Sequence, residues 1–375
     1  MTPAARPDAI VVGAGVVGAA CALALARDGR RVLVLDGRTV ASGTTSAGMG
    51  HLVALDDSPA QLALSACSLR LWRELLPELG DAVAHRPIGT LWLAEDDAQL
   101  AALAARRDGY AAAGVEAELL DARELAATEP ALCPGLAGAL RVPGDGVLDP
   151  PAAARRLLAL AREHGAELRE SCAVHALGPH EARGADDVYR AEVIVNAAGA
   201  WAPRLTPALP IVPRKGHLVL GDAQPELCRH QLVETGYLAS AHALDGASVA
   251  FNVQPRPGGR LAVGSSRELA GWDASVNEPL VVRMLERARH FLPGLATLRA
   301  ERVCTGFRPA TPDGLPYVGR WPALAGQWVA AGHEGLGLTT APGTARLLAD
   351  LVAGREPAID ARPYDPARVL QPHGA

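Results

Sequence analysis

The sequence predicts an α/β fold in which a nucleotide-binding domain of Rossmann type, discontinuous along the chain, carries an inserted antiparallel-sheet domain. Near the N-terminus an apolar strand, a glycine-rich turn and an apolar helix follow one another, which is the order of a βαβ unit. Between residues 212 and 266 short apolar runs alternate with Gly, Pro and Asp turns, which is typical of an antiparallel sheet. A second glycine-rich segment precedes the last long helix. We expect residues 1–80, 145–210 and 300–375 to form the nucleotide-binding domain, and residues 81–144 and 211–299 to form the inserted, substrate-binding domain.

Local signals predict the N-terminal elements. Asp8–Val12 is an apolar run ending in glycine, which favours a buried parallel strand. Val16–Arg27 has the apolar spacing of a helix and Gly29 stops it, so Arg31–Leu35 becomes the second strand of a right-handed βαβ unit. Thr39–Leu52 is rich in Gly, Ser and Thr and predicts a loop.

Capping residues mark the helices that follow. Ser58, with proline next to it, starts a helix that runs to about Leu79. Asp121 caps a short helix ended by Pro130, and Asp149 begins another that Gly165 closes. The other predicted elements are strands at Ile88–Ala94, within residues 167–177, at Val188–Val195, His217–Leu220, Leu232–Ala239, Ser248–Val253, Leu261–Gly264 and Gln327–Ala331, and helices at Asp97–Ala113, Leu280–Phe291 and Thr340–Val352.

Composition excludes several classes of protein. A length of 375 residues suggests about two domains. A net charge of −5 and a pI near 6.1 give no reason to expect nucleic acid as a partner. The six cysteines are scattered, without a C-x-x-C pair or zinc spacing, so we expect no metal and a reduced, intracellular protein. Three glycines break the apolar run Ala9–Ala26, which we interpret as a buried strand and helix rather than a membrane span or a signal peptide.

The first motif with a chemical meaning is Gly13-x-Gly15-x-x-Gly18, with Asp36 at the end of the second strand. The three glycines permit a tight turn, a close approach of the backbone to a pyrophosphate, and packing of the helix on the strand. Asp36 would accept hydrogen bonds from a ribose diol. The alternative is a glycine-rich turn followed by a surface aspartate.

Two further segments suggest close approach of backbone to a ligand. Val195–Trp201 ends a strand in small residues, although tight packing where two chain segments cross would explain it equally well. The glycine run at 332–337 precedes a helix, so several backbone N–H groups and a positive helix end point at one place. That arrangement would stabilise a reduced flavin, and the alternative is an ordinary turn. An enzyme that uses NAD alone needs no second glycine loop, so the pair favours FAD.

Arg308 stands between Phe307 and Pro309 in the first of two predicted C-terminal loops. A guanidinium group in apolar surroundings pairs well with a carboxylate, because its fork of N–H donors matches the two oxygens. A structural salt bridge with an acid such as Asp313 is the alternative.

The chain resembles the D-amino-acid oxidase superfamily of FAD-dependent oxidoreductases, in the branch of glycine oxidase, sarcosine oxidase and bacterial D-amino-acid dehydrogenases. The matching motifs occur in the family order over nearly the whole chain. They are residues 11–18, 42–52, 195–201, 306–319 and 332–339. Residues 47–53, 56–60 and 213–218 are most like D-hydroxyproline dehydrogenases. The resemblance implies a Rossmann-like FAD-binding domain of glutathione-reductase type and a non-covalent FAD.

The resemblance also implies the cofactor contacts, residue by residue. Around the pyrophosphate, ribityl and ribose groups it implies Gly13, Gly15, Val16, Val17, Gly18, Asp36, Thr44, Thr45, Ser46, Ala198, Gly199 and Trp201. Val174 would hold the adenine through its backbone. Along the flavin ring it implies Gly48, Met49, Gly50, His51, Leu52, Arg308, Gly332, Gly335, Leu336, Gly337, Leu338 and Thr339.

For catalysis the resemblance implies Arg308 as the anchor of the substrate carboxylate, His51 beside the flavin and Tyr237 as a pocket aromatic residue. A hydrogen-bonded structural histidine is an equal interpretation of His51. Phe251 and Trp272 lie in the same segment as Tyr237, and for all three a place in the core is the alternative.

This sequence departs from the family pattern at several positions. Amine oxidases place a lysine over the flavin in the strand that corresponds to residues 260–264, where this chain has Ala262; that favours an electron acceptor other than oxygen. Glu334 stands where glycine oxidases carry other residues. Cys304 is offset by two residues from a covalent flavin attachment, so a buried thiol is expected, and no role is assigned to Lys215, the only lysine.

The expected reaction is oxidation of a D-configured or cyclic amino acid to its imino acid, with cis-4-hydroxy-D-proline as the leading substrate. Three alternatives are open: a peroxide-producing oxidase of the glycine or sarcosine type, an NAD-dependent dehydrogenase, and a flavin-bearing or non-catalytic subunit of a larger complex. We expect a cytoplasmic protein without a transmembrane segment, for which peripheral contact with the inner face of a bacterial membrane and homo- or hetero-oligomers stay open.

Overall fold

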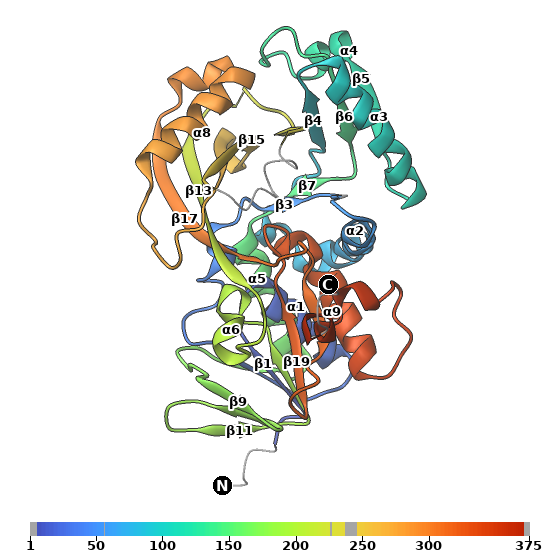
Figure 1. The fold of residues 1–375 in the computed structure, drawn as a ribbon, viewed down its shortest axis with the longest axis vertical. Helices are drawn as coiled ribbons and strands as arrows, with labels where there is room; N and C mark the ends of the chain where they lie inside the picture. The colour runs from blue at the N-terminus through green and yellow to red at the C-terminus, as the bar shows by residue number, and fades with distance from the viewer. Residues whose placement is uncertain (1–5, 56, 226, 237–245, 371–375) are drawn as a thin grey trace.

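The computed structural model describes residues 6–55, 57–225, 227–236 and 246–370. Figure 1 shows two lobes, one built on β1, α1, α9 and β19 and the other on β13, β15, β17 and α8. The helices are α1 (Val16–Arg27), α2 (Pro59–Leu79), α3 (Asp97–Ala112), α4 (Ala122–Thr128), α5 (Pro150–Glu163), α6 (Ala202–Leu205), α8 (Glu278–Phe291) and α9 (Gly337–Val352). The strands are β1 (Ala9–Val12), β2 (Val32–Leu35), β3 (His51–Leu52), β4 (Thr90–Ala94), β5 (Glu118–Asp121), β6 (Gly138–Val142), β7 (Gly146–Val147), β8 (Glu167–Arg169), β9 (Ala176–Gly178), β10 (Glu181–Arg183), β11 (Val188–Arg190), β12 (Val193–Asn196), β13 (Val212–Ala223), β14 (Gln231–Glu234), β15 (Ser248–Pro255), β16 (Arg260–Arg267), β17 (Ala300–Ala310), β18 (Tyr317–Arg320) and β19 (Gln327–Ala331).

The lower lobe in Figure 1 is built on a six-stranded sheet in the order β18-β19-β12-β1-β2-β8. Strands β19, β12, β1, β2 and β8 run parallel, and β18 is antiparallel to β19. Every residue of β1 and β2 is buried, as expected of strands covered on both faces. The β1–α1–β2 unit confirms the predicted βαβ start and the α/β fold class.

The upper lobe is built on an eight-stranded sheet in the order β17-β13-β16-β15-β14-β4-β6-β5. Its pairs are antiparallel except for β4 and β14, which run parallel, so the prediction of a purely antiparallel sheet is wrong at this one place. The two strands come from distant parts of the chain, and a long connection permits parallel pairing. One face of the sheet packs on α8 through a core that includes Leu232, Phe251 and Phe291.

Strand β17 corrects the prediction of a loop at Gly306–Pro309. It runs antiparallel to β13, with Arg308 opposite Arg214. Glycine and proline hid this strand from sequence analysis, yet proline is tolerated because β17 lies at the edge of the sheet. β17 follows residue 300, where the nucleotide-binding domain was predicted to resume. It nevertheless pairs within the eight-stranded sheet of the other lobe.

Other strands were missed because their apolar patterns are short. These are β5 and β6 at one edge of the large sheet, β18 in the second predicted C-terminal loop, and β10 in a small three-stranded sheet with β9 and β11. The predicted loop at residues 39–52 contains a short 3₁₀ turn, η1 (Thr44–Ala47), and β3. β14 ends at Glu234, and the rest of its predicted range reaches residues outside the described part.

The predicted helix caps are confirmed. The Ser58 hydroxyl accepts from the backbone of Gln61, and Asp121 forms a capping box with Glu124. Asp149 caps α5, which begins with Pro150. These side chains satisfy backbone N–H groups that have no partner inside the helix, which is why the helix starts could be predicted.

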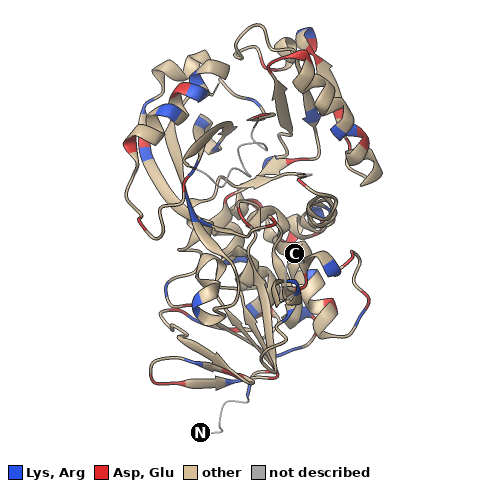
Figure 2. Cartoon of the chain, in the orientation of Figure 1, with Lys and Arg blue, Asp and Glu red and all other residues tan. Residues whose placement is uncertain are grey.

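Charge and hydropathy are unexceptional. Figure 2 shows basic and acidic residues interspersed over both lobes, in keeping with a net charge of −5. Within the described ranges no helix combines the length and the apolar character needed to cross a membrane.

Buried Asp145 should make stability depend on pH. Its Oδ1 accepts from the backbone N–H of Ala54 at 3.0 Å, and burial raises its pKa from 3.8 to about 7. The folded protein therefore holds a proton that the unfolded chain releases above about pH 4, so the stabilisation is lost as pH rises through about 7. This amounts to at most about 4 kcal/mol.

Asp145→Asn should flatten that dependence, which thermal unfolding of native and variant protein between pH 5 and pH 8 would measure. Asp350→Asn is the contrasting variant and should leave the slope between pH 5 and pH 8 unchanged. Burial raises the pKa of Asp350, but Arg346 and Arg355 lower it to a net value below 3.8, so Asp350 stays ionised over this range. Equal slopes for native protein and Asp145→Asn would show that Asp145 does not hold this proton.

Candidate functional site

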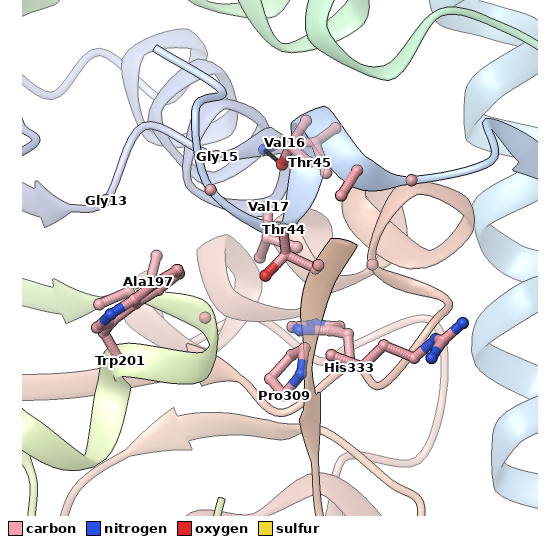
Figure 3. A pocket seen from close by; sticks show the side chains of 18 of the residues that line it. Gly13, Gly15, Val16, Val17, Thr44, Thr45, Ala197, Trp201, Pro309 and His333 are labelled. Atoms are coloured by element: carbon pink, nitrogen blue, oxygen red, sulfur yellow. Dashed lines mark hydrogen bonds between the residues drawn. The ribbon is translucent and has the colours of Figure 1, made fainter. Parts of the chain in front are cut away.

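A cavity of about 650 Å³ lies at the carboxyl ends of β1 and β2, where the two lobes meet. Its walls are segments far apart in sequence, namely residues 12–17, 35–51, 173–175, 197–205, 216–218 and 306–309, and residues 330–338. This volume falls within the range of about 300–1,000 Å³ that is usual for ligand sites. Figure 3 shows the cavity between the glycine turn at Gly13 and Gly15, the Thr44–Thr45 segment, Trp201 and His333.

The three glycines of the N-terminal turn differ in their surroundings. Gly13 has φ of 115°, and a Cβ there would lie 2.5 Å from Ala197 O, so the turn needs glycine for conformation and for space. A Cβ at Gly18 would lie 1.9 Å from Gly13 O, which shows that Gly18 serves helix packing and does not line the cavity. A Cβ at Gly15 would meet only Thr45 Oγ1, at 3.2 Å. Gly15 therefore leaves its side-chain space to the cavity.

Asp36 lies at the cavity wall beside the start of α1. Its Oδ2 accepts from the backbone of Ala14 at 2.7 Å and its Oδ1 from the backbone of Arg38 at 2.8 Å. These bonds fix the carboxylate at the carboxyl end of β2, where the sequence predicts a ribose contact. Val16 and Val17 line the same wall.

The η1 turn connects the two lobes next to this wall. Thr45 Oγ1 accepts from the Val16 N–H at 3.1 Å, drawn as a dashed line in Figure 3, and Thr44 Oγ1 donates to Phe307 O of β17 at 2.6 Å. Thr44 and Thr45 therefore line the cavity as predicted. Ser46 does not, because its hydroxyl donates to Gly43 O within the turn.

The segment after β12 both lines the cavity and forms a tight crossing of two chain segments, which were the two interpretations left open by the sequence. Ala198, Gly199 and Trp201 line the cavity, and Val174 lies on the wall nearby. Ala197 also packs against Gly13, so this is a tight crossing of two chain segments as well as a cavity wall.

The C-terminal glycine segment forms the opposite wall, at the start of α9. Gly335, Gly337 and Leu338 line the cavity. Thr339 supports them from behind, since its hydroxyl donates to His51 O at 2.9 Å and accepts from Val53 N at 3.3 Å. These bonds hold the start of α9 against the segment that carries His51.

His51 lies where the large cavity meets a second, smaller one. Burial lowers its pKa to about 4; the charges of Arg308 and Arg256 act in the same direction and a hydrogen bond with the Gly335 backbone opposes them. The imidazole is therefore neutral at physiological pH. Within the described part of the chain, its Nδ1 has no hydrogen-bond partner. Gly48, Met49 and Gly50 line the large cavity just before it.

Arg308 reaches the large cavity from β17. Its Nη1 donates to Ser266 O of β16 at 2.9 Å, and its Nε lies 3.5 Å from where a Cβ of Gly335 would stand. Asp313, the acid named as an example in the predicted salt-bridge alternative, pairs with Arg368 at 2.8 Å instead.

The second cavity has a volume of about 130 Å³ and shares His51, Glu334 and Gly335 with the first. It lies against the eight-stranded sheet. Arg214 and Arg267 are among its lining residues, and Arg214 pairs with Glu334 at 2.7 Å.

Several predicted residues do not line the large cavity. Besides Gly18 and Ser46 they are Leu52, Gly332, Leu336 and Thr339. Leu336 lines the second cavity instead. At Gly332 a Cβ would lie 2.6 Å from Thr311 Cγ2, so this glycine permits close packing.

The predicted aromatic residues fall in different places. Tyr237 lies outside the described residues. Phe251 is in the core, stacked on Phe291. Trp272 is 40% exposed and stacks on Trp201, so it is neither core nor pocket.

The residues that depart from the family pattern are accounted for by packing or pairing. Ala262 is fully buried on β16 and packs with Met49 and Cys304. Cys304 is only partly buried, so the expectation of a buried thiol is wrong there. Lys215 pairs with Glu268 at 3.0 Å. Cys304 and Lys215 do not line either of these two cavities.

Sequence analysis missed other wall residues. His217 reaches the large cavity from β13, and Arg38 and Arg204 lie near Trp201. Gln231 and Asn252 line the second cavity. No motif marks them. The pairing of strands shows which way His217, Gln231 and Asn252 face, whereas Arg38 and Arg204 lie outside the strands and reach the wall through the tertiary fold.

The walls fit one long ligand with a nucleotide end and a ring end. Asp36 and Val174 line the cavity together with the start of α1, and His51 and Gly335 line it together with the start of α9. The two helix starts adjoin, since a Cβ of Gly337 would lie 3.7 Å from Val17 Cγ2. Two helix N-termini at the wall favour negative charge at both places. The glycine turn provides the close backbone approach that a pyrophosphate needs.

Comparisons with known proteins agree with this geometry. A family model described as FAD dependent oxidoreductase matches residues 8–351. Glycine oxidase of Geobacillus kaustophilus (strain HTA426) is 31% identical and the match covers 97% of each chain. D-amino acid dehydrogenase of Methylobacterium nodulans (strain LMG 21967 / CNCM I-2342 / ORS 2060) is 33% identical over 80% of this chain and 71% of that protein.

Solved structures of similar proteins have the same fold. The crystal structure of glycine oxidase from Geobacillus kaustophilus superposes with a TM-score of 0.86 at 31% identity, covering 99% of this chain and 100% of that one. L-proline dehydrogenase from P. horikoshii has the same fold, with a TM-score of 0.88 at 23% identity and 97% of each chain covered. The chain belongs to the DAO family of FAD-dependent oxidoreductases, and its cofactor is FAD.

Proposed function

We propose that this protein oxidises a D-configured or cyclic amino acid to its imino acid, with cis-4-hydroxy-D-proline as the leading substrate. The observation that carries the proposal is the position of Arg308, which β17 brings to the wall of the large cavity beside Gly335, a residue that both cavities share. A guanidinium there can hold an amino acid by its carboxylate. Two relatives at 31% and 33% identity are named glycine oxidase and D-amino acid dehydrogenase, which supports an amino acid substrate.

The protein's own residues would orient the substrate and keep it reactive. Bound FAD, held without a covalent bond, supplies the acceptor for the hydride that leaves Cα. The nitrogen lone pair forms the C=N bond as that hydride leaves, so the amine must first be neutral. For a proline-like ring the product is a pyrroline carboxylate. Neutral His51, whose Nδ1 has no partner among the described residues, can hold the neutral amine by a hydrogen bond.

The pH profile should show that His51 does not titrate in the neutral range. We expect kcat/KM to rise with pH as the substrate ammonium group loses its proton, without a step near 6.5, the ordinary pKa of histidine. His51→Gln should lower kcat and keep the shape of the profile. A step near 6.5 that disappears in His51→Gln would show that the imidazole titrates in the free enzyme.

Electron transfer to an acceptor other than oxygen is the second part of the proposal. Ala262 stands at the position where the family's amine oxidases carry a lysine that assists oxygen, so this strand offers no positive charge there. The chain's lysine, Lys215, forms an ion pair with Glu268. The similarity to glycine oxidase over 97% of the chain favours a second candidate, a peroxide-producing oxidase.

Anaerobic mixing of the yellow holoprotein with amino acids tests the reaction. D-proline, L-proline, cis-4-hydroxy-D-proline, glycine, sarcosine and D-alanine would be compared by bleaching of the flavin. Reoxidation by an artificial acceptor, with little peroxide in air, would support a dehydrogenase. Rapid peroxide formation would support the oxidase, and NADH formation with an unbleached flavin would refute both.

A further inference from the structure

The second cavity lies against one face of the eight-stranded sheet. Register places Trp92 beside Val233, and Val233 opposite Asn252, so these three side chains share a face. Gln231, two residues before Val233, lies on the same face. The alternate residues, among them Leu232, belong to the core under α8. One face therefore builds the core and the other faces the cavity.

The cavity-facing residues carry buried polar atoms. Trp92, Gln231 and Asn252 are 2%, 2% and 3% exposed, and Thr311 closes the cavity from the other side at 7%. Among the described residues, Trp92 Nε1, Gln231 Oε1, Asn252 Oδ1 and Thr311 Oγ1 have no hydrogen-bond partner. His51 lines this cavity too, and its Nδ1 also lacks a partner among the described residues. Buried polar groups are normally paired, so these five atoms around one cavity indicate a polar occupant.

The cavity is small and joins the proposed reaction site. At about 130 Å³ it has room for roughly four waters of about 30 Å³ each, which is comparable to a small side chain or ring. His51, Glu334 and Gly335 belong to both cavities. A substrate held by Arg308 in the large cavity can therefore extend its side chain into the small one.

The polar groups without partners are neutral and include both hydrogen-bond donors and acceptors. An indole N–H only donates, a hydroxyl donates and accepts, and each amide offers a donor and an acceptor. A neutral hydroxyl group can donate to one of the two amide oxygens and accept from the indole N–H, whereas an aliphatic group can do neither. Arg214 is paired with Glu334, and Arg267 also lines the cavity, so an acidic side chain is the rival occupant.

We propose that this cavity is the side-chain subsite of the enzyme, and that Gln231 and Asn252 select a small amino acid carrying a neutral hydroxyl over its aliphatic and acidic counterparts. The inference rests on the proposed amino acid oxidation and adds the residues that would recognise the substrate hydroxyl group. A site built to pair with a substrate hydroxyl rejects the analogue that lacks it, because its own polar groups are then left unpaired.

Matched substrate pairs test the subsite in the holoenzyme. The pairs are cis-4-hydroxy-D-proline with D-proline and D-serine with D-alanine. We expect kcat/KM to be at least about tenfold higher for the hydroxylated member of the better pair. In Gln231→Met and Asn252→Leu, which keep volume and remove the amide, that ratio should fall toward one, because the hydroxylated member loses its partner and the unhydroxylated member no longer leaves an amide unpaired.

Two controls separate selection from loss of structure. Gln224→Met removes an amide that bonds to Asp222 and lies outside this cavity, so it should leave the ratio unchanged. Flavin content and the melting temperature of each variant should match the native holoprotein, because the amides of Gln231 and Asn252 lack partners for Oε1 and Oδ1.

The outcomes are distinct. Equal kcat/KM within both pairs, or a ratio that survives both substitutions, would overturn the subsite and leave the proposed reaction intact. Preference for D-aspartate or D-glutamate, abolished by Arg267→Met, would overturn it in favour of an acidic substrate. Failure of every amino acid to bleach the flavin would remove the proposed function and the subsite together.

Discussion

Gly15→Ala is expected to give a folded protein that binds FAD about 5- to 150-fold more weakly than the native chain. The new Cβ would meet only Thr45 Oγ1, at 3.2 Å, and would otherwise occupy the space left to the cofactor at the start of α1. Overfilling a packed site typically costs about 1–3 kcal/mol, and each 1.4 kcal/mol is a tenfold change in affinity. Titration of apoprotein with FAD, followed by flavin fluorescence, measures the effect.

Two other glycines serve as matched controls. Gly29, which follows α1, has nothing within 4 Å of its ideal Cβ but has φ of 81°, so Gly29→Ala should lose a little stability and keep native FAD affinity. Gly18→Ala should lose stability and flavin together, since its Cβ would lie 1.9 Å from Gly13 O. Native affinity in Gly15→Ala would mean that no part of the cofactor passes over this turn.

These glycines also show why much of the fold could be predicted. The N-terminal strand, turn and helix are specified by neighbouring residues, and helix caps such as Ser58 and Asp149 act within one helical turn. The same holds for the glycine segment before α9. Local signals of this kind need no knowledge of the rest of the chain.

What could not be predicted depends on which strands become neighbours. Arg308 was found through its motif, but the strand that carries it is defined by its pairing with β13. Gln231, Asn252 and Trp92 come from three strands, and only the parallel pairing of β4 with β14 brings the tryptophan to the other two. The second cavity is formed by residues from several strands, so no single segment of the sequence predicts it. The domain boundaries and the catalytic role of Tyr237 stay predictions.

The largest loss of activity is expected from Arg308→Ala. The bond from Nη1 to Ser266 O fixes the guanidinium of Arg308 at the cavity wall, and the side chain lies beside Gly335. Removing one partner of a buried charge pair typically costs about 2–5 kcal/mol, which is about 30- to 4,000-fold in kcat/KM. Most of this should appear as a higher KM, because the carboxylate is held in the ground state as well as in the transition state.

Arg308→Lys tests whether the shape of the cation matters in addition to its charge. Lysine keeps a positive charge but cannot make two parallel N–H···O bonds to one carboxylate, so kcat/KM should fall between those of the native enzyme and Arg308→Ala. Arg302→Ala is the control, because Arg302 lies on the same strand, is exposed and does not line either cavity. All three variants must contain native amounts of FAD. If Arg308→Ala keeps native kcat/KM while Arg267→Ala loses it, the carboxylate is held from the second cavity and the substrate lies in the opposite orientation to the one proposed.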